Sequence, residues 1–143
     1  MDTKFWGPGG WRFLHTITFN YPENPTAADK RNYKSLFLNF QFTLPCKYCR
    51  ESYAKFLREL PIEPYLASRS KLTMWLYLIH NKVNDKLRNQ GNPTPPNPSY
   101  AYVAGEYEKQ RANCSKEKKT CSKSNSGLSG APLSLADRMT FLI

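Results

Sequence analysis

Residues 70–88 read SKLTMWLYLIHNKVNDKLR, and this stretch decides the fold. Its aliphatic residues recur every three or four positions, which is the period of an α-helix buried along one side. The spacing predicts a helix from Ser70 to about Arg88, ending before Gly91. The residues of this aliphatic seam are Leu72, Leu76, Ile79, Val83 and Leu87.

A second face of the same helix is polar. Its residues are also three or four positions apart, so their side chains share one narrow arc. Two amides and an imidazole directly behind a core seam are unusual, because each buried amide without a partner costs about 1–3 kcal/mol. A nucleotide cofactor would supply the missing partners. The polar face consists of Tyr77, His80, Asn81, Asn84 and Arg88.

The rest of the chain up to residue 108 also has helical patterns. A first helix is expected over residues 7–20, with Pro8 at its opening. A second follows a capping box at residues 26–29, in which Asp takes the place of Glu. A third runs from Pro45 to Pro61, and Ser99 caps a short fifth helix after the GNPTPPNP loop.

No segment has the alternating pattern of a strand, and no internal repeat is present. We therefore predict an all-α fold, a four-helix bundle with a short fifth helix. Residues 1–112 form the expected domain, and residues 113–143 a flexible Lys/Ser-rich C-terminal tail. The last twelve residues, PLSLADRMTFLI, are apolar enough to dock somewhere, but the sequence does not indicate where.

The formal charge of +10 raises the question of nucleic-acid binding. Six basic residues against one acidic residue lie between Lys109 and Lys123, so half of the excess is concentrated near the end. A specific binder would carry a basic face along one element, whereas this pattern is typical of a solvated arm. Nucleic-acid binding is therefore not expected to be the main role.

Neither a secretory signal nor a membrane span is found in the sequence. We expect a cytoplasmic protein without a membrane partner. The four cysteines are too few for a secreted disulfide scaffold, and a Cys-x-x-Cys in an intracellular protein is more often catalytic or metal-binding than structural.

Cys46 and Cys49 lie at the start of the predicted third helix. A helix N-terminus together with Lys47 and Arg50 favours a thiolate, which is the species that exchanges disulfides. A structural zinc site would need two more ligands, and the spacings of the other His and Cys residues match no zinc module. No metal is therefore expected.

A thioredoxin-like relay is also disfavoured, because that fold needs strands around its redox helix. A helical dithiol cannot pass its electrons to oxygen unaided, so an organic cofactor is the natural inference. Trp11 and His15 are four residues apart and share one side of the first helix. They could stack on a flat heterocycle, although by themselves such pairs are more often part of a hydrophobic core.

At this point three strings resemble the FAD-linked sulfhydryl oxidases related to the augmenter of liver regeneration. They are WGPGGWRFLH, LPCKYC and WLYLIHNKVNDKL, in this order, and the resemblance spans about residues 5 to 108. It is closest to the compact members of the family encoded by large DNA viruses.

The resemblance implies an enzyme, a thiol oxidase with FAD bound noncovalently at the mouth of the bundle, in a homodimer. Substrate dithiols of a protein would attack Cys46, Cys49 would pass electrons to the flavin, and oxygen would become hydrogen peroxide. The residues implied at the cofactor are Trp11, His15, Tyr77, His80, Asn81, Asn84, Lys86, Arg88 and Tyr100.

Relatives also often carry a second cysteine pair that shuttles electrons from the substrate. Cys114 and Cys121 could do this, or could form a structural or intersubunit disulfide, or could stay free. A second class of function also stays open at this stage. It is a noncatalytic helical interaction module whose basic tail binds nucleic acid or an acidic partner.

Overall fold

The computed structural model describes residues 1–114 and 121–122. Within them lie five α-helices, one 3₁₀ helix and one pair of two-residue strands, which confirms the all-α class. The elements are α1 (Thr3–Phe19), α2 (Ala27–Thr43), α3 (Lys47–Glu59), η1 (Glu63–Ala67), α4 (Arg69–Asn89), α5 (Tyr100–Glu108), β1 (Asn113–Cys114) and β2 (Cys121–Ser122).

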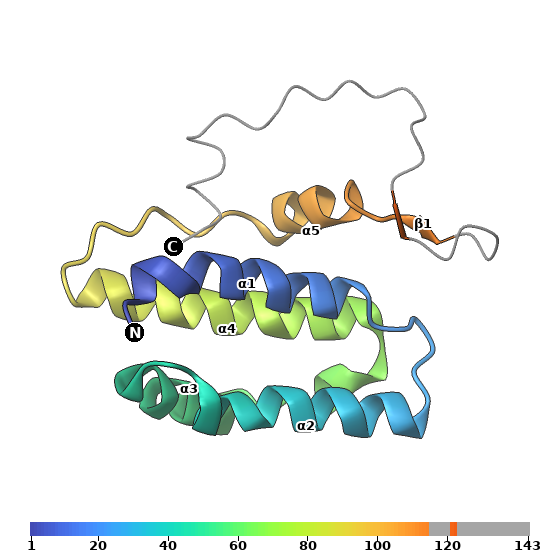
Figure 1. Ribbon diagram of the computed structural model, residues 1–143, viewed down its shortest axis with the longest axis horizontal. Helices are drawn as coiled ribbons and strands as arrows, with labels where there is room; N and C mark the ends of the chain where they lie inside the picture. Colours follow the sequence, from blue (N-terminus) through green and yellow to red (C-terminus); the bar gives the residue numbers. More distant parts are fainter. Residues whose placement is uncertain (115–120, 123–143) are drawn as a thin grey trace.

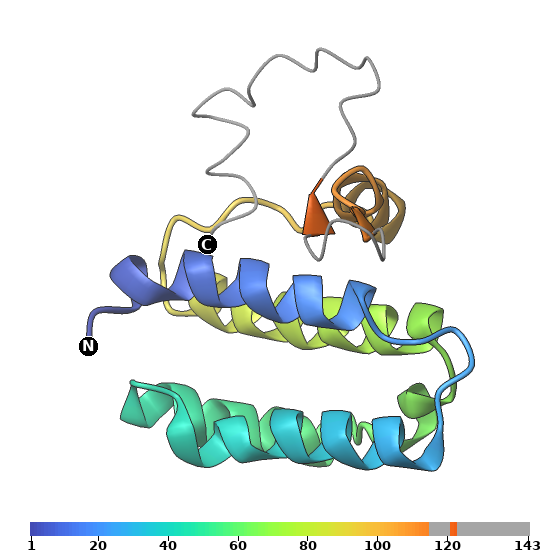
Figure 2. The ribbon, with the colours of Figure 1, turned by 45° about the vertical axis from the view of Figure 1, so that its right-hand side comes forward.

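Four helices form two layers. α1 packs along α4 in one layer, and α2 packs against α3 in the other (Figure 1). α5 lies across α1 and α4 on the side away from α2 and α3, which is clearest after the rotation in Figure 2. The polar face of α4 therefore meets α1 and α5, not the α2/α3 layer.

The buried core lies between the layers. Trp75, which the aliphatic pattern of α4 does not include, is fully buried there, and its ring meets Phe37 edge-on with the centroids 5.1 Å apart. Its indole N–H donates to the carbonyl oxygen of Leu60 at 3.0 Å. The other core residues are Tyr21, Tyr53, Phe56, Leu57, Ile62, Leu66, Leu72, Leu76 and Ile79.

Side-chain caps set the beginning of most helices. Thr26 and Asp29 form both bonds of the predicted capping box at α2, and Ser99 caps α5 as predicted. Ser68 caps α4 by accepting from the backbone N–H of Lys71. The IEPYLAS connection between α3 and α4 contains the 3₁₀ helix η1.

The start of α1 was predicted incorrectly. Asp2 accepts a hydrogen bond from the Lys4 backbone N–H at 2.9 Å, so the helix begins four residues before the expected Gly7. Pro8 consequently lies inside the helix and not in its opening turn. Because proline is common in the first turn of a helix, Pro8 favours a start near Gly7 and does not indicate the earlier cap at Asp2.

The chain after α5 is only partly described. Backbones of β1 and β2 pair antiparallel, with Cys114 opposite Cys121. Two residues are too few for an alternating pattern, which is why the sequence does not predict this pair. The predicted flexible tail and the docking of residues 132–143 fall on residues 115–120 and 123–143, which lie outside the described part.

Candidate active site

An aromatic and imidazole cluster forms where α1 faces α4. The rings of Trp11 and His80 stack with centroids 3.9 Å apart and planes 10° from parallel. His15, one turn after Trp11, shares a hydrogen bond of 3.1 Å between its Nε2 and Nδ1 of His80. Three residues predicted from two separate helices thus form one contiguous group.

His15 is the most buried member of this cluster, at 3% exposure. Burial, aided by the proximity of His80, lowers the pKa of His15 to about 3, so its ring is neutral at ordinary pH. Its Nδ1 atom is buried and has no hydrogen-bond partner among the described residues. A buried polar nitrogen without a partner is costly, so this atom points to a hydrogen-bonding group outside the described residues.

Asn84 lies on the same face of α4 and repeats this feature. Its amide Nδ2 donates to Oδ1 of Asn97 at 3.1 Å, but its buried Oδ1 has no donor within the described part of the chain. Asn81, which lies between His80 and Asn84 in the sequence of α4, is half-buried. Within the described residues, unpaired hydrogen-bonding capacity therefore exists both on α1, at His15, and on α4, at Asn84.

Tyr77 and Tyr100, both predicted at the cofactor, contact each other edge-on with centroids 5.5 Å apart. The Tyr77 hydroxyl donates to the Pro98 carbonyl at 2.8 Å, and the Tyr100 hydroxyl shares a 2.7 Å bond with Thr73. In this structure the two tyrosines fasten the proline-rich loop and α5 to α4.

Lys86 and Arg88 point to different neighbours. Lys86 reaches across to α3, where its Nζ donates to the Ser52 hydroxyl at 2.5 Å. Arg88 donates to the carbonyl of Pro95 at 2.6 Å and pairs with Asp85. Lys86 thus links the polar part of α4 to the helix that carries the cysteine pair.

Cys46 is the N-cap of α3, and Cys49 lies in its first turn. The Cys46 sulfur accepts a hydrogen bond from the Cys49 backbone N–H at 3.3 Å. Both cysteines are half-buried and neither forms a disulfide. The third helix was predicted to start at Pro45; the cap places its first residue at Lys47, with Pro45 just outside.

The two thiols differ in acidity. Burial raises the pKa of Cys46, but hydrogen bonds from the Cys49 thiol and from the backbone amides of Cys49 and Tyr48, together with the charge of Lys86, lower it by more. Burial, and then the bond to Cys46 and its charge, raise the pKa of Cys49 to about 11 despite Lys86 and Arg50. Of the two thiols, Cys46 is therefore the more acidic.

Two contributors to the site were missed. Asn97 comes from the proline-rich loop and holds Asn84. Tyr107 of α5 stacks on Phe19 with centroids 4.9 Å apart and lies 5.3 Å from the His15 ring. Tyr107 lies in the predicted short fifth helix, but nothing in the sequence pairs that helix with the first one.

Within residues 1–114 and 121–122, no three or more His, Cys, Asp or Glu side chains come together as a metal-binding group. The helices in that same part include none long and apolar enough to cross a membrane.

Comparison with known proteins identifies the relatives of this chain. Residues 8–100 match the Erv1 / Alr family. The probable FAD-linked sulfhydryl oxidase R368 of Acanthamoeba polyphaga mimivirus is 41% identical over 59% of this chain and 59% of its own. The mitochondrial FAD-linked sulfhydryl oxidase ERV1 of Saccharomyces cerevisiae is 36% identical over 61% of this chain and 45% of its own. The chain thus spans about half the length of these curated relatives.

Solved structures agree with the sequence comparisons. The yeast Erv1 core superposes with a TM-score of 0.63 at 31% identity, over 76% of this chain and 82% of that one. The FAD binding domain of Erv1 from Saccharomyces cerevisiae gives the same TM-score at 32% identity, over 77% and 93%. None of these comparisons supports the alternative of a noncatalytic, nucleic-acid-binding module.

Proposed function

The chain belongs to the Erv1 / Alr family, and from this we propose that it is a flavin-dependent thiol oxidase that forms disulfides in protein substrates. Electrons would pass from a substrate dithiol through Cys46 and Cys49 to FAD and then to oxygen, giving hydrogen peroxide. The relatives described as FAD-linked sulfhydryl oxidases support this activity.

The observation that carries the proposal is the incomplete polar face between α1 and α4. His15 Nδ1 and Asn84 Oδ1 are buried without partners, next to the flat stack of Trp11 and His80. A flavin combines a flat aromatic ring with donors and acceptors along its edge, so the residues present fit this group. We propose that these four residues and Asn81 hold it.

Four further residues are proposed at the cofactor, although each of them already has a hydrogen-bond partner. Lys86 and Arg88 are suited to the phosphates by charge, and Tyr77 and Tyr100 to the adenine by ring shape. All four already have partners in this structure, namely Ser52, Asp85 with Pro95, Pro98 and Thr73. Their part in binding therefore requires that they keep or exchange these bonds when FAD is present.

The chemistry of the cysteines follows from their positions. A substrate thiolate attacks the sulfur of Cys46 in the oxidised pair, a bond forms between them, and Cys49 leaves as a thiolate. A second substrate thiolate then displaces Cys46, which leaves a disulfide in the substrate and both enzyme cysteines reduced. FAD, when bound, supplies the two-electron acceptor that this dithiol needs.

The acidity of the pair suits this order. The hydrogen bond and charge of Cys46 are two of the causes that raise the pKa of Cys49. Both vanish while Cys46 is bonded to the substrate, and Lys86 and Arg50 still act to lower the pKa. Cys49 is therefore a better thiolate in the mixed disulfide than in the free dithiol.

We also propose a homodimer. Large apolar side chains stand exposed on α1 and α2, among them Phe5 at 79%, Phe13 at 63% and Phe42 at 70%. Sedimentation velocity at micromolar concentration tests this, with a monomer as the contrary result.

The limits of the domain and the role of the tail are further proposals. We place the oxidase domain at residues 1–112 and the tail at 113–143, and we propose that Cys114 and Cys121 shuttle electrons from the substrate to Cys46 and Cys49. The cytoplasm as compartment stays a prediction, which cell fractionation would test.

A visible spectrum and an oxygen electrode test the central proposal. The purified protein should be yellow, with a flavin absorbance band, and should consume oxygen when dithiothreitol is added. A colourless protein that stays inactive after reconstitution with FAD would refute it.

A further inference from the structure

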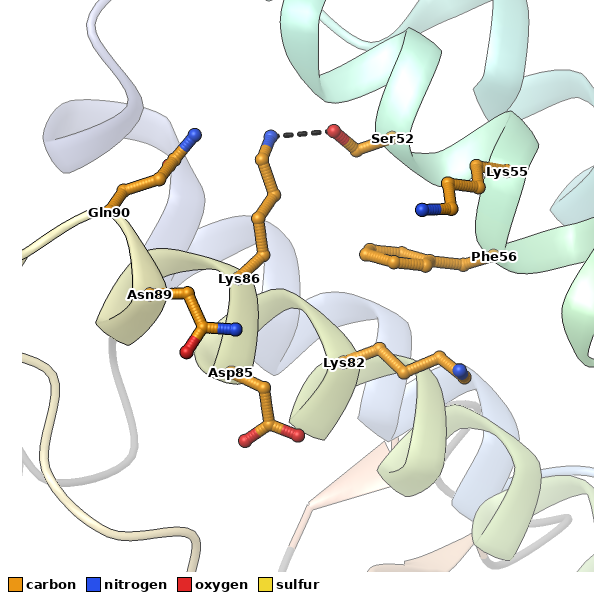
Figure 3. A pocket seen from close by; sticks show the side chains of 8 residues that line it. All are labelled: Ser52, Lys55, Phe56, Lys82, Asp85, Lys86, Asn89 and Gln90. Carbon is orange, nitrogen blue, oxygen red and sulfur yellow. Dashed lines mark hydrogen bonds between the residues drawn. The ribbon is translucent and has the colours of Figure 1, made fainter.

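A groove runs between α3 and α4, apart from the polar face described above (Figure 3). It has a volume of about 450 Å³. Ser52, Lys55 and Phe56 line it from α3, and Lys82, Asp85 and Lys86 from α4. Of the cofactor residues proposed on α4, only Lys86 is among its lining residues; Tyr77, His80, Asn81, Asn84 and Arg88 are not.

The groove carries a positive charge. Three lysines and one aspartate line it, and the aspartate is paired with Arg88 outside the groove. Lys55 and Lys82 both pair with Glu59, but at unequal distances of 3.8 and 2.8 Å, and the Lys55 side chain is 66% exposed. Lys86 pairs with no carboxylate in the described part of the chain. The groove thus has more positive charge than its own carboxylates neutralise.

The groove is adjacent to the redox pair. Lys86 contacts Ser52, one turn beyond Cys49, and its charge acts on the pKa of both Cys46 and Cys49. A molecule lying in the groove would therefore have its next residues beside Cys46. The floor is Phe56, with the Lys82 ammonium 5.7 Å from the centre of its ring.

From this we infer that the groove docks an acidic peptide segment adjoining the reactive cysteine of the protein substrate. The inference rests on the proposed oxidase activity and adds the class of substrate to it. Carboxylates of the segment would face Lys55, Lys82 and Lys86, and the Ser52 hydroxyl would serve its backbone. An occupant that must present a thiol to Cys46 is a peptide, and charge complementarity makes it an acidic one.

The first test measures binding without chemistry. Two fluorescein-labelled decapeptides carry Ser in place of the reactive Cys, one flanked by Asp and Glu, the other by Lys and Arg at the same positions. We expect the flavin-loaded protein to bind the acidic peptide at least tenfold more tightly by fluorescence anisotropy, with the difference shrinking in 0.5 M salt. Equal affinities would overturn the inference.

A matched pair of variants locates the site. Lys55→Gln/Lys82→Gln removes two groove charges, and Lys30→Gln/Lys71→Gln removes two exposed lysines elsewhere that form no ion pair within the described residues. The first should weaken acidic-peptide binding at least fivefold and the second less than twofold. Equal losses would mean that total charge, and not the groove, binds the peptide.

A kinetic measurement separates this inference from the oxidase proposal. With dithiol versions of the two peptides, the groove variant should lose kcat/KM for the acidic peptide only, while oxidation of dithiothreitol and the flavin absorbance stay unchanged. Loss of flavin from a variant that still melts cooperatively would assign the groove to the cofactor and overturn the inference. Absence of any dithiothreitol oxidation in the unmodified protein would instead refute the oxidase.

Discussion

The core between the two layers and the cluster between α1 and α4 differ in whether their buried polar atoms have hydrogen-bond partners. In the core, Tyr21 donates to the Leu66 carbonyl, Tyr53 to that of Phe37 and Trp75 to that of Leu60. The buried side-chain atoms without partners lie instead on α1, α4 and the loop that follows α4. They are Trp6 Nε1, His15 Nδ1, Asn84 Oδ1 and Thr94 Oγ1.

This difference distinguishes the core, which stabilises the fold, from the cluster, which is proposed to bind the cofactor. The core is complete without any other molecule, because each of its polar side chains finds an acceptor within the chain. The cluster contains unpaired buried atoms that lower the free energy of unfolding. A bound cofactor that forms hydrogen bonds with these atoms would remove this cost. Changes in the two regions should therefore have different signatures.

The largest effect is expected from substitution of a redox cysteine, which changes neither the core nor the cluster. Cys49→Ser should lower the rate of thiol oxidation at least about a thousandfold, as loss of a nucleophile does, with little change in melting temperature. When the variant is incubated with the oxidised, disulfide form of the substrate, the Cys46 thiolate should attack that disulfide, release one substrate sulfur as a thiolate and accumulate as a mixed disulfide, detected by non-reducing mass spectrometry. Cys46→Ser is the control: it should be equally inactive, and a mixed disulfide found on it would reverse the two roles.

The core should respond through stability. Trp75→Ala removes a fully buried side chain and leaves the Leu60 carbonyl without its donor, so it should lower the free energy of unfolding by about 3–5 kcal/mol. Urea unfolding with and without FAD measures it. The loss should be similar in both conditions; a loss confined to the FAD-bound form would place Trp75 in the site.

Two isosteric changes then compare the regions directly. Asn84→Leu should leave the stability of FAD-free protein within about 1 kcal/mol, because it removes an unpaired buried oxygen along with the bond to Asn97. It should weaken FAD binding about tenfold, the equivalent of 1.4 kcal/mol.

Tyr53→Phe is its counterpart in the core. It removes the bond to the Phe37 carbonyl and should cost about 1 kcal/mol of stability while FAD affinity stays the same. Isothermal titration of apoprotein with FAD measures both affinities. If the two variants lose FAD equally, the distinction between core and cluster fails.

A further difference between the two regions is a pH dependence. The pKa of His15 falls from 6.5 in the unfolded chain to about 3 in the fold, so between these values the unfolded state binds the extra proton. The His15 contribution to stability is thus full above pH 6.5 and is lost as the pH falls toward 3. Unfolding at pH 7 to 4 should show a shallower fall in His15→Asn than in the unmodified protein; parallel curves would contradict the neutral buried imidazole.

The sequence predicted features that depend on near neighbours. The Thr26–Asp29 box, the Ser99 cap and the pairing of Trp11 with His15 follow from residues three or four apart. The contact of both residues with His80 followed only from the resemblance, which placed them around one cofactor.

What the sequence missed depends on distant partners or on competing local signals. Asn97 reaches Asn84 from a proline-rich loop without a period, and Lys86 meets Ser52 across two helices. Pro8 is equally compatible with the opening of a helix and with its second turn, and only the Asp2 cap decides between them. Trp75 was missed because an aliphatic seam was sought where an aromatic side chain fills the core.

The sulfur of Cys46 caps the beginning of α3, and in the proposed reaction the same sulfur exchanges disulfides. A thiolate accepts the Cys49 amide proton more strongly than a sulfur bonded to another sulfur does. The strength of the Cys49 backbone hydrogen bond thus depends on the oxidation state of the pair. The Cys49 amide should exchange with deuterium slowly in reduced protein and faster once the pair is oxidised. That one amide would serve as a built-in reporter of where the enzyme stands in its cycle.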